Sequence, residues 1–424
     1  MWGILTSKWK CSSLIVQEIA MKTRLKSGFI AFLIFIFFLS VSTANPIIQR
    51  KENVETVEGA RIVHNEKGGK WGEDLPIKIE LIRTIGDIDT LDENLAFNRP
   101  SDLVLDDENN IYILDAGNCR IQKFDFTGKF VASFGREGQG PGEFQLPISL
   151  DIDARGNLIV ADLRSRKIQI FSKEGSLLNT ITMTKTPLSN VYALNSGLLA
   201  TIGTLGYDVE GKGNEPLPKL IRLLDADGNI VKEFGDMFDY KHRMLNQKGN
   251  LFHFVVGDDD FIYLAFSFQN RIDKYSPQGI LLWKADRVLN FKTKPLDKGK
   301  IERTATSKSF YSPNMNSVSG AIAADSAGRI WVVTYKRQIK EEERVYTIMS
   351  SSQGGTTTET KGNTDLQETD MYALEIFDAD GVLLGEIPLT HFADGITIKN
   401  NHLFLLDQMR GVKYYQYKII QQPH

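Results

Sequence analysis

The chain has 424 residues, of which 42% are hydrophobic and 24% are charged, and its net charge is −3. This is the composition of a folded protein with a large core. A mildly acidic balance without a basic run argues against phosphate backbones as partners, so no nucleic acid is expected.

Residues 1–44 have the order of a secretory leader. A basic stretch at residues 22–26 precedes an apolar run at residues 28–39, and small residues follow at 42–44. This order predicts a signal peptide cleaved after Ala44, with Met21 as the start of translation. The alternative is an uncleaved anchor, but the run is short for a span of ~20 residues. We therefore expect export to the periplasm or beyond the cell, with no stable membrane span after cleavage.

The chain repeats itself after the leader. Residues 100–128 match residues 147–175, which gives a period of 47 residues. Such periods are typical of propeller blades or of helical arrays. Apolar residues alternate between turns rich in Asp, Asn and Gly, so the units are predicted to be strands. Each unit is expected to form four strands, a to d from the inside outward.

The turns give the number of units. The turn between strands a and b recurs six times, but the turn between c and d recurs only five times, because the last unit stops near Ile419. Residues 79–86 resemble the missing strand d. We therefore predict a six-bladed propeller over residues 75–420, closed by an N-terminal strand that completes the last blade and shields its edge. Residues 45–74 are expected to be a linker and residues 421–424 a tail.

Two adjoining segments carry a family resemblance. Asp115-Ala-Gly-Asn-Cys-Arg-Ile-Gln-Lys-Phe-Asp, followed by Phe134-Gly-Arg-Glu-Gly-Gln-Gly-Pro-Gly-Glu-Phe, resembles an NHL repeat. The chain after the leader is similar to the bacterial secreted proteins known as 6-bladed β-propellers. The resemblance implies an all-β ring of four-stranded antiparallel blades that serves as a binding platform. It implies no particular reaction, because propellers host many functions.

Long connections are expected on one face of the ring only. The b–c and d–a connections share this face, called here the long-loop face, and they include residues 136–144, 203–219, 236–250, 286–317 and 336–370. Repeat proteins commonly bind through the face that carries their insertions. Residues 350–364, inside the blade 5 insertion, are almost free of apolar residues and are expected to be mobile. Their flanks, 344–348 and 371–376, could extend the blade as a long hairpin.

Alignment of the repeats places one residue of each strand a near the channel mouth on the long-loop face. These residues are Asp102, Ser149, Asn190, His253, Ala321 and Asp394. All but the alanine are candidates for binding a polar ligand, and Asp102, His253 and Asp394 could hold a divalent metal. No other cofactor is expected. The structural alternative is that inner strands need polar residues to face a water-filled channel.

No catalytic residue is assigned, because the chain has no nucleophile elbow, nucleotide-binding loop or paired cysteine motif. The sequence therefore favours an exported, non-catalytic scaffold that engages a protein, peptide or glycan through the long-loop face. A metal-dependent lyase or hydrolase at the channel mouth is the alternative. A sensor or assembly subunit is a third interpretation, and the oligomeric state stays open.

Overall fold

The computed structural model describes residues 53–57, 59–87, 89–183, 188–203, 216–303, 308–352 and 355–422. All of them fall in one unit, Asn53–His424, and the predicted leader, residues 1–44, lies outside the described residues. Strands dominate these ranges, and the protein is all-β as predicted. No helix within these ranges is long and apolar enough to cross a membrane.

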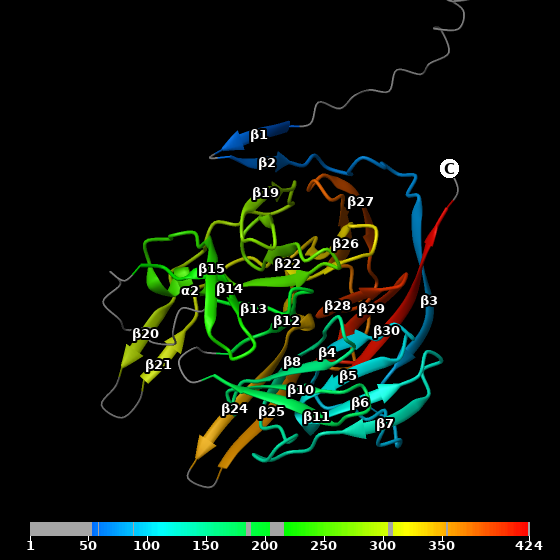
Figure 1. Cartoon of the computed structure of the whole chain (residues 1–424). Helices are drawn as coiled ribbons and strands as arrows, with labels where there is room; N and C mark the ends of the chain where they lie inside the picture. The colour runs from blue at the N-terminus through cyan, green and yellow to red at the C-terminus, as the bar shows by residue number, and fades with distance from the viewer. Residues whose placement is uncertain are drawn as a thin grey trace, which may run out of the picture. The chain divides into compact units, whose positions relative to one another are not determined.

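Six four-stranded antiparallel blades are arranged around a common centre, and two further strands extend the sheet of blade 4 (Figure 1). Blades 1 to 3 consist of β4 (Pro100–Leu105), β5 (Ile111–Asp115), β6 (Arg120–Phe124) and β7 (Phe130–Phe134); β8 (Pro147–Ile152), β9 (Leu158–Asp162), β10 (Lys167–Phe171) and β11 (Leu177–Thr182); and β12 (Val191–Ala193), β13 (Leu199–Ile202), β14 (Lys219–Leu224) and β15 (Ile230–Asp236). Blades 4 to 6 consist of β16 (Phe252–Val256), β17 (Ile262–Phe266), β18 (Ile272–Tyr275) and β19 (Leu281–Asp286); β22 (Ser319–Ala324), β23 (Ile330–Tyr335), β26 (Tyr372–Phe377) and β27 (Leu383–Pro388); and β28 (Gly395–Lys399), β29 (His402–Asp407), β30 (Lys413–Gln421) and β3 (Ile77–Ile85).

The N-terminal strand closes the ring, as predicted. β3 pairs antiparallel with β30, with Ile79 opposite Ile419 and Ile85 opposite Tyr414. Blade 6 therefore takes three strands from the C-terminal end of the chain and its outermost strand from the N-terminal end (Figure 1). Blade 6 cannot form unless the first and last strands of the ring meet.

Short turns join the strands through a recurrent arrangement of Asp and Gly. In the c–d turn of blade 1, the Asp125 carboxylate accepts hydrogen bonds from the backbone N–H groups of Thr127 (2.8 Å) and Lys129 (3.0 Å). Gly128 completes the turn at φ +82°, a left-handed conformation that strains residues with a Cβ. Each such turn is marked by an Asp and a Gly a few residues apart in the sequence. The turns can therefore be counted along the chain, and their count gives the number of blades.

The core consists of six apolar clusters, one at each junction between neighbouring blades. The cluster between blades 6 and 1, for example, contains Ile85, Leu103, Phe404 and Tyr414. Each blade therefore buries both of its faces, as sheets in a closed ring must. The apolar strands b, such as β5 and β9, have no exposed residue because they lie between two such clusters.

The segment expected to be a linker contains two strands that sequence analysis missed. β1 (Asn53–Val57) and β2 (Ala60–His64) form a hairpin, and β2 pairs in parallel with β19 of blade 4. Asn65 then reaches blade 5, where its side chain donates to the Gly381 carbonyl at 3.0 Å and accepts from the Leu383 N–H at 2.7 Å. The chain before β3 therefore runs along the outer edges of blades 4 and 5.

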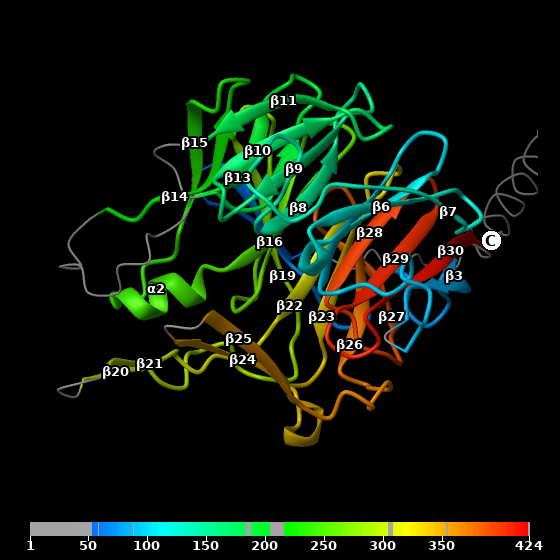
Figure 2. The same ribbon diagram turned by 90° about the horizontal axis from the view of Figure 1, so that it is seen from below.

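Additional elements project from the long-loop face. They are α2 (Arg243–Gly249), the hairpin of β20 (Lys300–Arg303) and β21 (Lys308–Tyr311), the 3-10 turn η2 (Glu341–Glu343), and the hairpin of β24 (Val345–Ser352) and β25 (Gly355–Gly362). Figure 2 shows α2 and both hairpins on the same side of the ring. The helix was not predicted. Residues 204–215 of the predicted blade 3 loop lie outside the described residues.

The predicted arrangement of the blade 5 insertion needs correction. The polar segment, residues 350–364, includes the end of β24 and all of strand β25, and these two strands pair at eight positions from Val345–Gly362 to Ser352–Gly355. That this segment is mobile stays a prediction. Residues 371–376, expected to extend the blade with the other flank, belong instead to strand c of the blade, β26. Strand β25 is rich in threonine, a residue type that favours extended backbone through its branched Cβ.

Shortening the chain from its N-terminus tests the ring closure. A chain that starts at Asn65 keeps β3, so we expect a cooperative thermal transition with Tm lowered by only a few degrees. A chain that starts at Asp87 lacks β3 and exposes the edge of β30, so we expect aggregation or loss of the cooperative transition. Circular dichroism melts and light scattering compare the two, and equal stability would contradict closure by β3.

Candidate functional site

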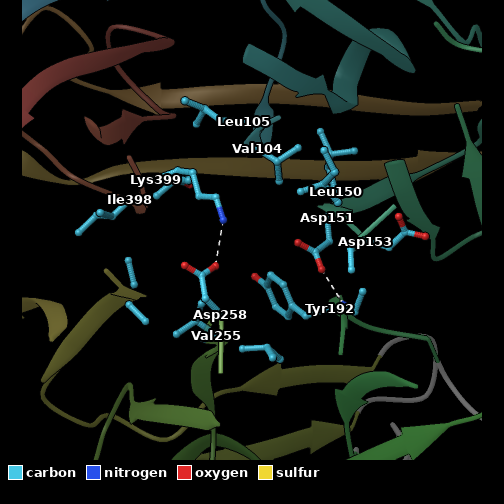
Figure 3. Close-up of a pocket in the computed structure, with 18 of the residues that line it drawn as sticks. Val104, Leu105, Leu150, Asp151, Asp153, Tyr192, Val255, Asp258, Ile398 and Lys399 are labelled. Atoms are coloured by element: carbon cyan, nitrogen blue, oxygen red, sulfur yellow. Dashed lines mark hydrogen bonds and ion pairs between the residues drawn. The ribbon is translucent and has the colours of Figure 1, made fainter. Parts of the chain in front are cut away.

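Two cavities lie along the central channel and meet at a shared waist. The loop-side cavity, of about 140 Å³, is lined by the first residues of the inner strands, where the chain enters from the long-loop face. The turn-side cavity, of about 300 Å³, is lined by the last residues of these strands and by the a–b turns (Figure 3). The residues that line both cavities are Asp102, Leu103, Tyr192, Ile322, Ile396 and Thr397.

The structure brings four of the five predicted site residues together. Asp102, Asn190, His253 and Asp394 all line the loop-side cavity, as does Ala321. Ser149 lines neither cavity, because it is fully buried between blades 2 and 3 and its Oγ accepts a hydrogen bond from the Val191 N–H at 3.1 Å. That the other four bind a ligand stays a prediction.

Contacts between neighbouring inner strands explain why this ring of positions is polar. Inner strands of adjacent blades belong to different sheets, so they do not satisfy one another's backbone groups through a ladder. Instead, Asp102 of blade 1 accepts from the Leu150 N–H of blade 2 at 3.1 Å. Thr397 of blade 6 donates to the Leu103 carbonyl of blade 1 at 3.1 Å. The side chains of one blade thus complete the hydrogen bonding of the next.

Burial favours the uncharged forms of the titratable side chains that line the loop-side cavity. Loss of solvation raises the pKa of Asp102 to about 7 and that of Asp394 to about 6, despite backbone N–H donors that oppose the shift. The imidazole of His253 keeps accessible surface toward the channel, but protein surrounds it and lowers its pKa to about 4. Burial therefore favours the uncharged form of this histidine and the protonated form of Asp102.

The three predicted metal ligands line one cavity, but the described structure does not group them around a single point. Within the described residues, no group of three or more His, Cys, Asp or Glu side chains lies close enough to hold an ion. Asp102 and Asp394 each also accept a backbone hydrogen bond, from Leu150 at 3.1 Å and from Gln408 at 2.9 Å. Their carboxylates are thus partly engaged in holding the blades.

The turn-side cavity contains functional groups that sequence analysis missed. Asp151 accepts from the Ala193 N–H at 2.6 Å, and burial raises its pKa to about 7. Lys399 of blade 6 and Asp258 of blade 4 form an ion pair of 2.9 Å across the cavity (Figure 3). Asp151 lies two residues after Ser149, so the alternation of strand β8 could have placed it near the channel. The pair across the ring has no such local signal.

The closed ring of six four-stranded blades around a polar channel defines the class of protein as a six-bladed β-propeller. Residues 82–304, more than half of the chain, match the model of the family DUF5128, described as 6-bladed beta-propeller. The chain belongs to this family.

Curated relatives match only parts of the chain. NHL repeat-containing protein 3 of Homo sapiens is 31% identical over 99 residues, which cover 23% of this chain and 28% of that protein. Protein brain tumor of Drosophila melanogaster is 26% identical over 145 residues, which cover 33% of this chain and 12% of that protein. This chain therefore spans less than a third of the length of these relatives, and the similarity to an NHL repeat is confirmed.

Solved structures share the fold at low sequence identity. A member of the DUF4221 family from Bacteroides vulgatus has a TM-score of 0.53 and 12% identity, with 81% of this chain and 99% of that chain covered. A Bacteroides fragilis protein described as exported has a TM-score of 0.50 and 12% identity, with 85% of this chain and all of the other covered. At such identities the likeness concerns the fold alone.

The raised pKa of Asp102 predicts how stability depends on pH. The folded state holds the proton more tightly than the unfolded chain, so Asp102 makes the free energy of unfolding fall as pH rises from about 4 to about 7. The fall amounts to about 1.4 kcal/mol per unit of raised pKa. Asp102→Asn removes this contribution, and urea denaturation at pH 4.5 and pH 8 should show a smaller difference than in the wild type.

The control for this measurement is Asp107→Asn, a change at an exposed residue of the neighbouring turn. It should keep the wild-type dependence on pH. If Asp102→Asn retained the full wild-type difference between the two pH values, the carboxyl would not be buried in the way described.

Proposed function

We propose that this chain is an exported, non-catalytic binding platform that engages a protein, peptide or glycan through its long-loop face. The observation that carries the proposal is the one-sided distribution of ordered extra elements. α2 and both hairpins extend from the connections of blades 3, 4 and 5 on one side of the ring (Figure 2). The blades themselves are similar to one another, and the extra elements lie in the connections between strands. Such connections can change in length and sequence without disturbing the blades, so binding residues commonly lie in them.

Large apolar side chains are exposed around these elements. They are Phe238, Leu251, Val288, Leu296, Phe310, Tyr311 and Ile339. Phe310 is 49% exposed and Tyr311 is 46% exposed, and both lie at the end of strand β21. Exposed aromatic residues close together are typical of surfaces that bind other molecules.

Side-chain contacts hold the α2 region in a fixed conformation. The Asn250 side chain accepts from the Phe238 N–H at 2.8 Å and donates to the Phe238 carbonyl at 2.9 Å. Lys248 donates to the Pro313 carbonyl at 2.6 Å, which ties the helix to the connection before blade 5. A surface ordered before binding loses less conformational entropy when a partner docks.

The base of the blade 5 insertion is anchored by ionic contacts. Arg337 forms an ion pair of 2.5 Å with Glu343, and it also contacts Asp370 at the other end of the insertion. The Glu343 carboxylate has its pKa lowered to about 2, chiefly by the hydrogen bond from Arg337. Arg410 of blade 6 donates to the Glu343 carbonyl. The β24–β25 hairpin thus projects from a base held by two blades.

The connection between blades 4 and 5 carries an excess of positive charge, which favours an acidic partner at that part of the face. Residues 286–317 contain seven Lys or Arg and three Asp or Glu, whereas the whole chain carries a net charge of −3. Complementary charge accelerates encounter and selects among partners. Export is supported by the leader-like order of residues 1–44 and by the description of the Bacteroides fragilis protein of similar fold.

Substitution at β21 tests the platform. Phe310→Ala with Tyr311→Ala removes two exposed aromatic anchors, so capture of partners from the extracytoplasmic fraction of the source cells should fall about 30-fold or more. The matched control is Phe126→Ala, an exposed phenylalanine of a c–d turn on the other face. Quantitative mass spectrometry measures the captured proteins and glycans. Equal capture by all variants would contradict the proposal.

The metal-dependent lyase or hydrolase remains the second candidate, because Asp102, His253 and Asp394 line one cavity. It predicts at least one divalent ion per chain in protein purified without added metal, and loss of that ion in His253→Ala. The platform predicts no stoichiometric metal in either protein. Elemental analysis of both, with His402→Ala as the control variant, separates the two candidates.

A further inference from the structure

The connection from blade 4 to blade 5 carries a row of exposed lysines. They are Lys292, Lys294, Lys298 and Lys300. Lys300 pairs with Glu302 at 2.6 Å, but within the described residues the other three lysines form no ion pair. Their positive charges therefore face solvent without a partner from the described part of the chain.

The carboxylates of the same connection do not cancel this charge. Asp297 accepts hydrogen bonds from the backbone N–H groups of Asn314 at 3.0 Å and Gly299 at 2.8 Å, and these bonds lower its pKa. Residues 292–303 contain four Lys, one Arg, one Asp and one Glu, so positive charges exceed negative charges by three. The whole chain, in contrast, has a net charge of −3.

Backbone contacts fix the segment that carries the lysines. The Leu296 N–H donates to the Asn314 carbonyl at 2.9 Å, and the Asn316 side chain donates to the Lys292 carbonyl at 2.9 Å. A Cβ at Gly299 would lie 2.5 Å from the Tyr311 carbonyl oxygen, so the connection and strand β21 approach as closely as glycine permits. An ordered segment of this kind loses little conformational entropy on binding.

Exposed apolar side chains lie among the lysines. Leu296, which stands between two of them in the sequence, is 64% exposed. Tyr311 of β21 is also exposed, and the Lys300 Nζ lies 4.7 Å from the centre of its ring. A partner that removes the leucine and the ring from water gains free energy, provided that it also offers negative charge to the ammonium groups.

These residues surround no pocket. None of them lines the loop-side or the turn-side cavity, and the β20–β21 hairpin projects from the ring beside α2 (Figure 2). A small anion on such a surface meets only one or two exposed charges, and exposed pairs contribute little. A broad anionic surface meets all the lysines together. The interface of a lipid bilayer with anionic headgroups offers this charge and also accepts apolar side chains.

We propose that residues 292–300, together with Tyr311, dock the protein on the surface of a bilayer that contains anionic phospholipid. The lysines pair with lipid phosphates, and Leu296 and Tyr311 enter the headgroup region. The acidic balance of the whole chain is repelled by such a surface, so this basic segment is the part that turns toward it. The inference goes beyond the platform that binds a protein, peptide or glycan, and it does not rest on it.

Sedimentation with lipid vesicles tests the docking surface. The exported form, residues 45–424, is used because the apolar run at residues 28–39 would itself bind lipid. The probes are vesicles of phosphatidylcholine alone and of phosphatidylcholine with about 30% phosphatidylglycerol. We expect binding to the anionic vesicles to be at least about 10-fold tighter than to the neutral ones, and to weaken between about 0.05 M and about 0.5 M NaCl.

Replacement of three lysines measures the electrostatic part. Each lysine near an anionic surface raises affinity about fivefold, so Lys292→Gln, Lys294→Gln and Lys298→Gln together should lower it about 100-fold. The matched control changes the net charge equally, through Lys129→Gln, Lys173→Gln and Lys232→Gln. These three lysines are exposed in or next to c–d turns on the other face, and the control should keep the wild-type affinity.

Leu296→Asn measures the apolar part and should lower affinity for the anionic vesicles about 3- to 10-fold. Its control is Leu178→Asn, a change at a leucine of β11 that is 55% exposed, which should have no effect. All of the substituted residues are exposed, so circular dichroism melts should match the wild type.

Three results would overturn the proposal. The first is no sedimentation with anionic vesicles, and the second is equal binding by the variant at Lys292, Lys294 and Lys298 and by its control. The third is lysine-dependent binding of polyglutamate in solution without binding to vesicles, which would identify an acidic polypeptide as the partner instead. The vesicle assay contains no other protein, so its result is independent of the capture experiment with Phe310 and Tyr311.

Discussion

The pairing of β3 with β30 is the constraint on which the rest of the structure depends. Each blade covers the apolar face of the next, so six junctions are satisfied only when the ring is closed. The same pairing sets Ile85 opposite Tyr414 and holds strand β30 at the junction of blades 6 and 1. Closure therefore places Tyr414 at the junction of blades 6 and 1, where it contributes to the lining of the loop-side cavity.

The channel shows how one set of residues can both connect neighbouring blades and line a cavity. Neighbouring inner strands do not pair, so polar side chains such as Asp102 and Ser149 complete the backbone hydrogen bonds between blades. Ser149 is fully buried and only joins blades 2 and 3, whereas Asp102 also lines the loop-side cavity. A polar residue in strand a is therefore weak support for a binding site by itself.

Most of the ring could be predicted from sequence because its signals are local. Asp and Gly in turns and alternating strands recur with the blades, and residues 79–86 match the missing strand. Four cavity residues followed from aligned repeats. The β1–β2 hairpin was missed because its partner, β19, lies more than 200 residues away. β25 was missed because its threonines lack the apolar alternation of a buried strand. The position of Tyr414 at the cavity depends on packing between the two ends of the chain, for which the sequence has no local pattern.

Hydrogen–deuterium exchange of the backbone amides of β3, Ile77–Ile85, tests the closed ring most directly. A strand paired with β30 should protect the N–H groups directed at its partner as strongly as those of β7, the corresponding outer strand of blade 1. Exchange of all β3 amides at the rate of an unstructured peptide, while β7 stays protected, would show an open ring and contradict the account.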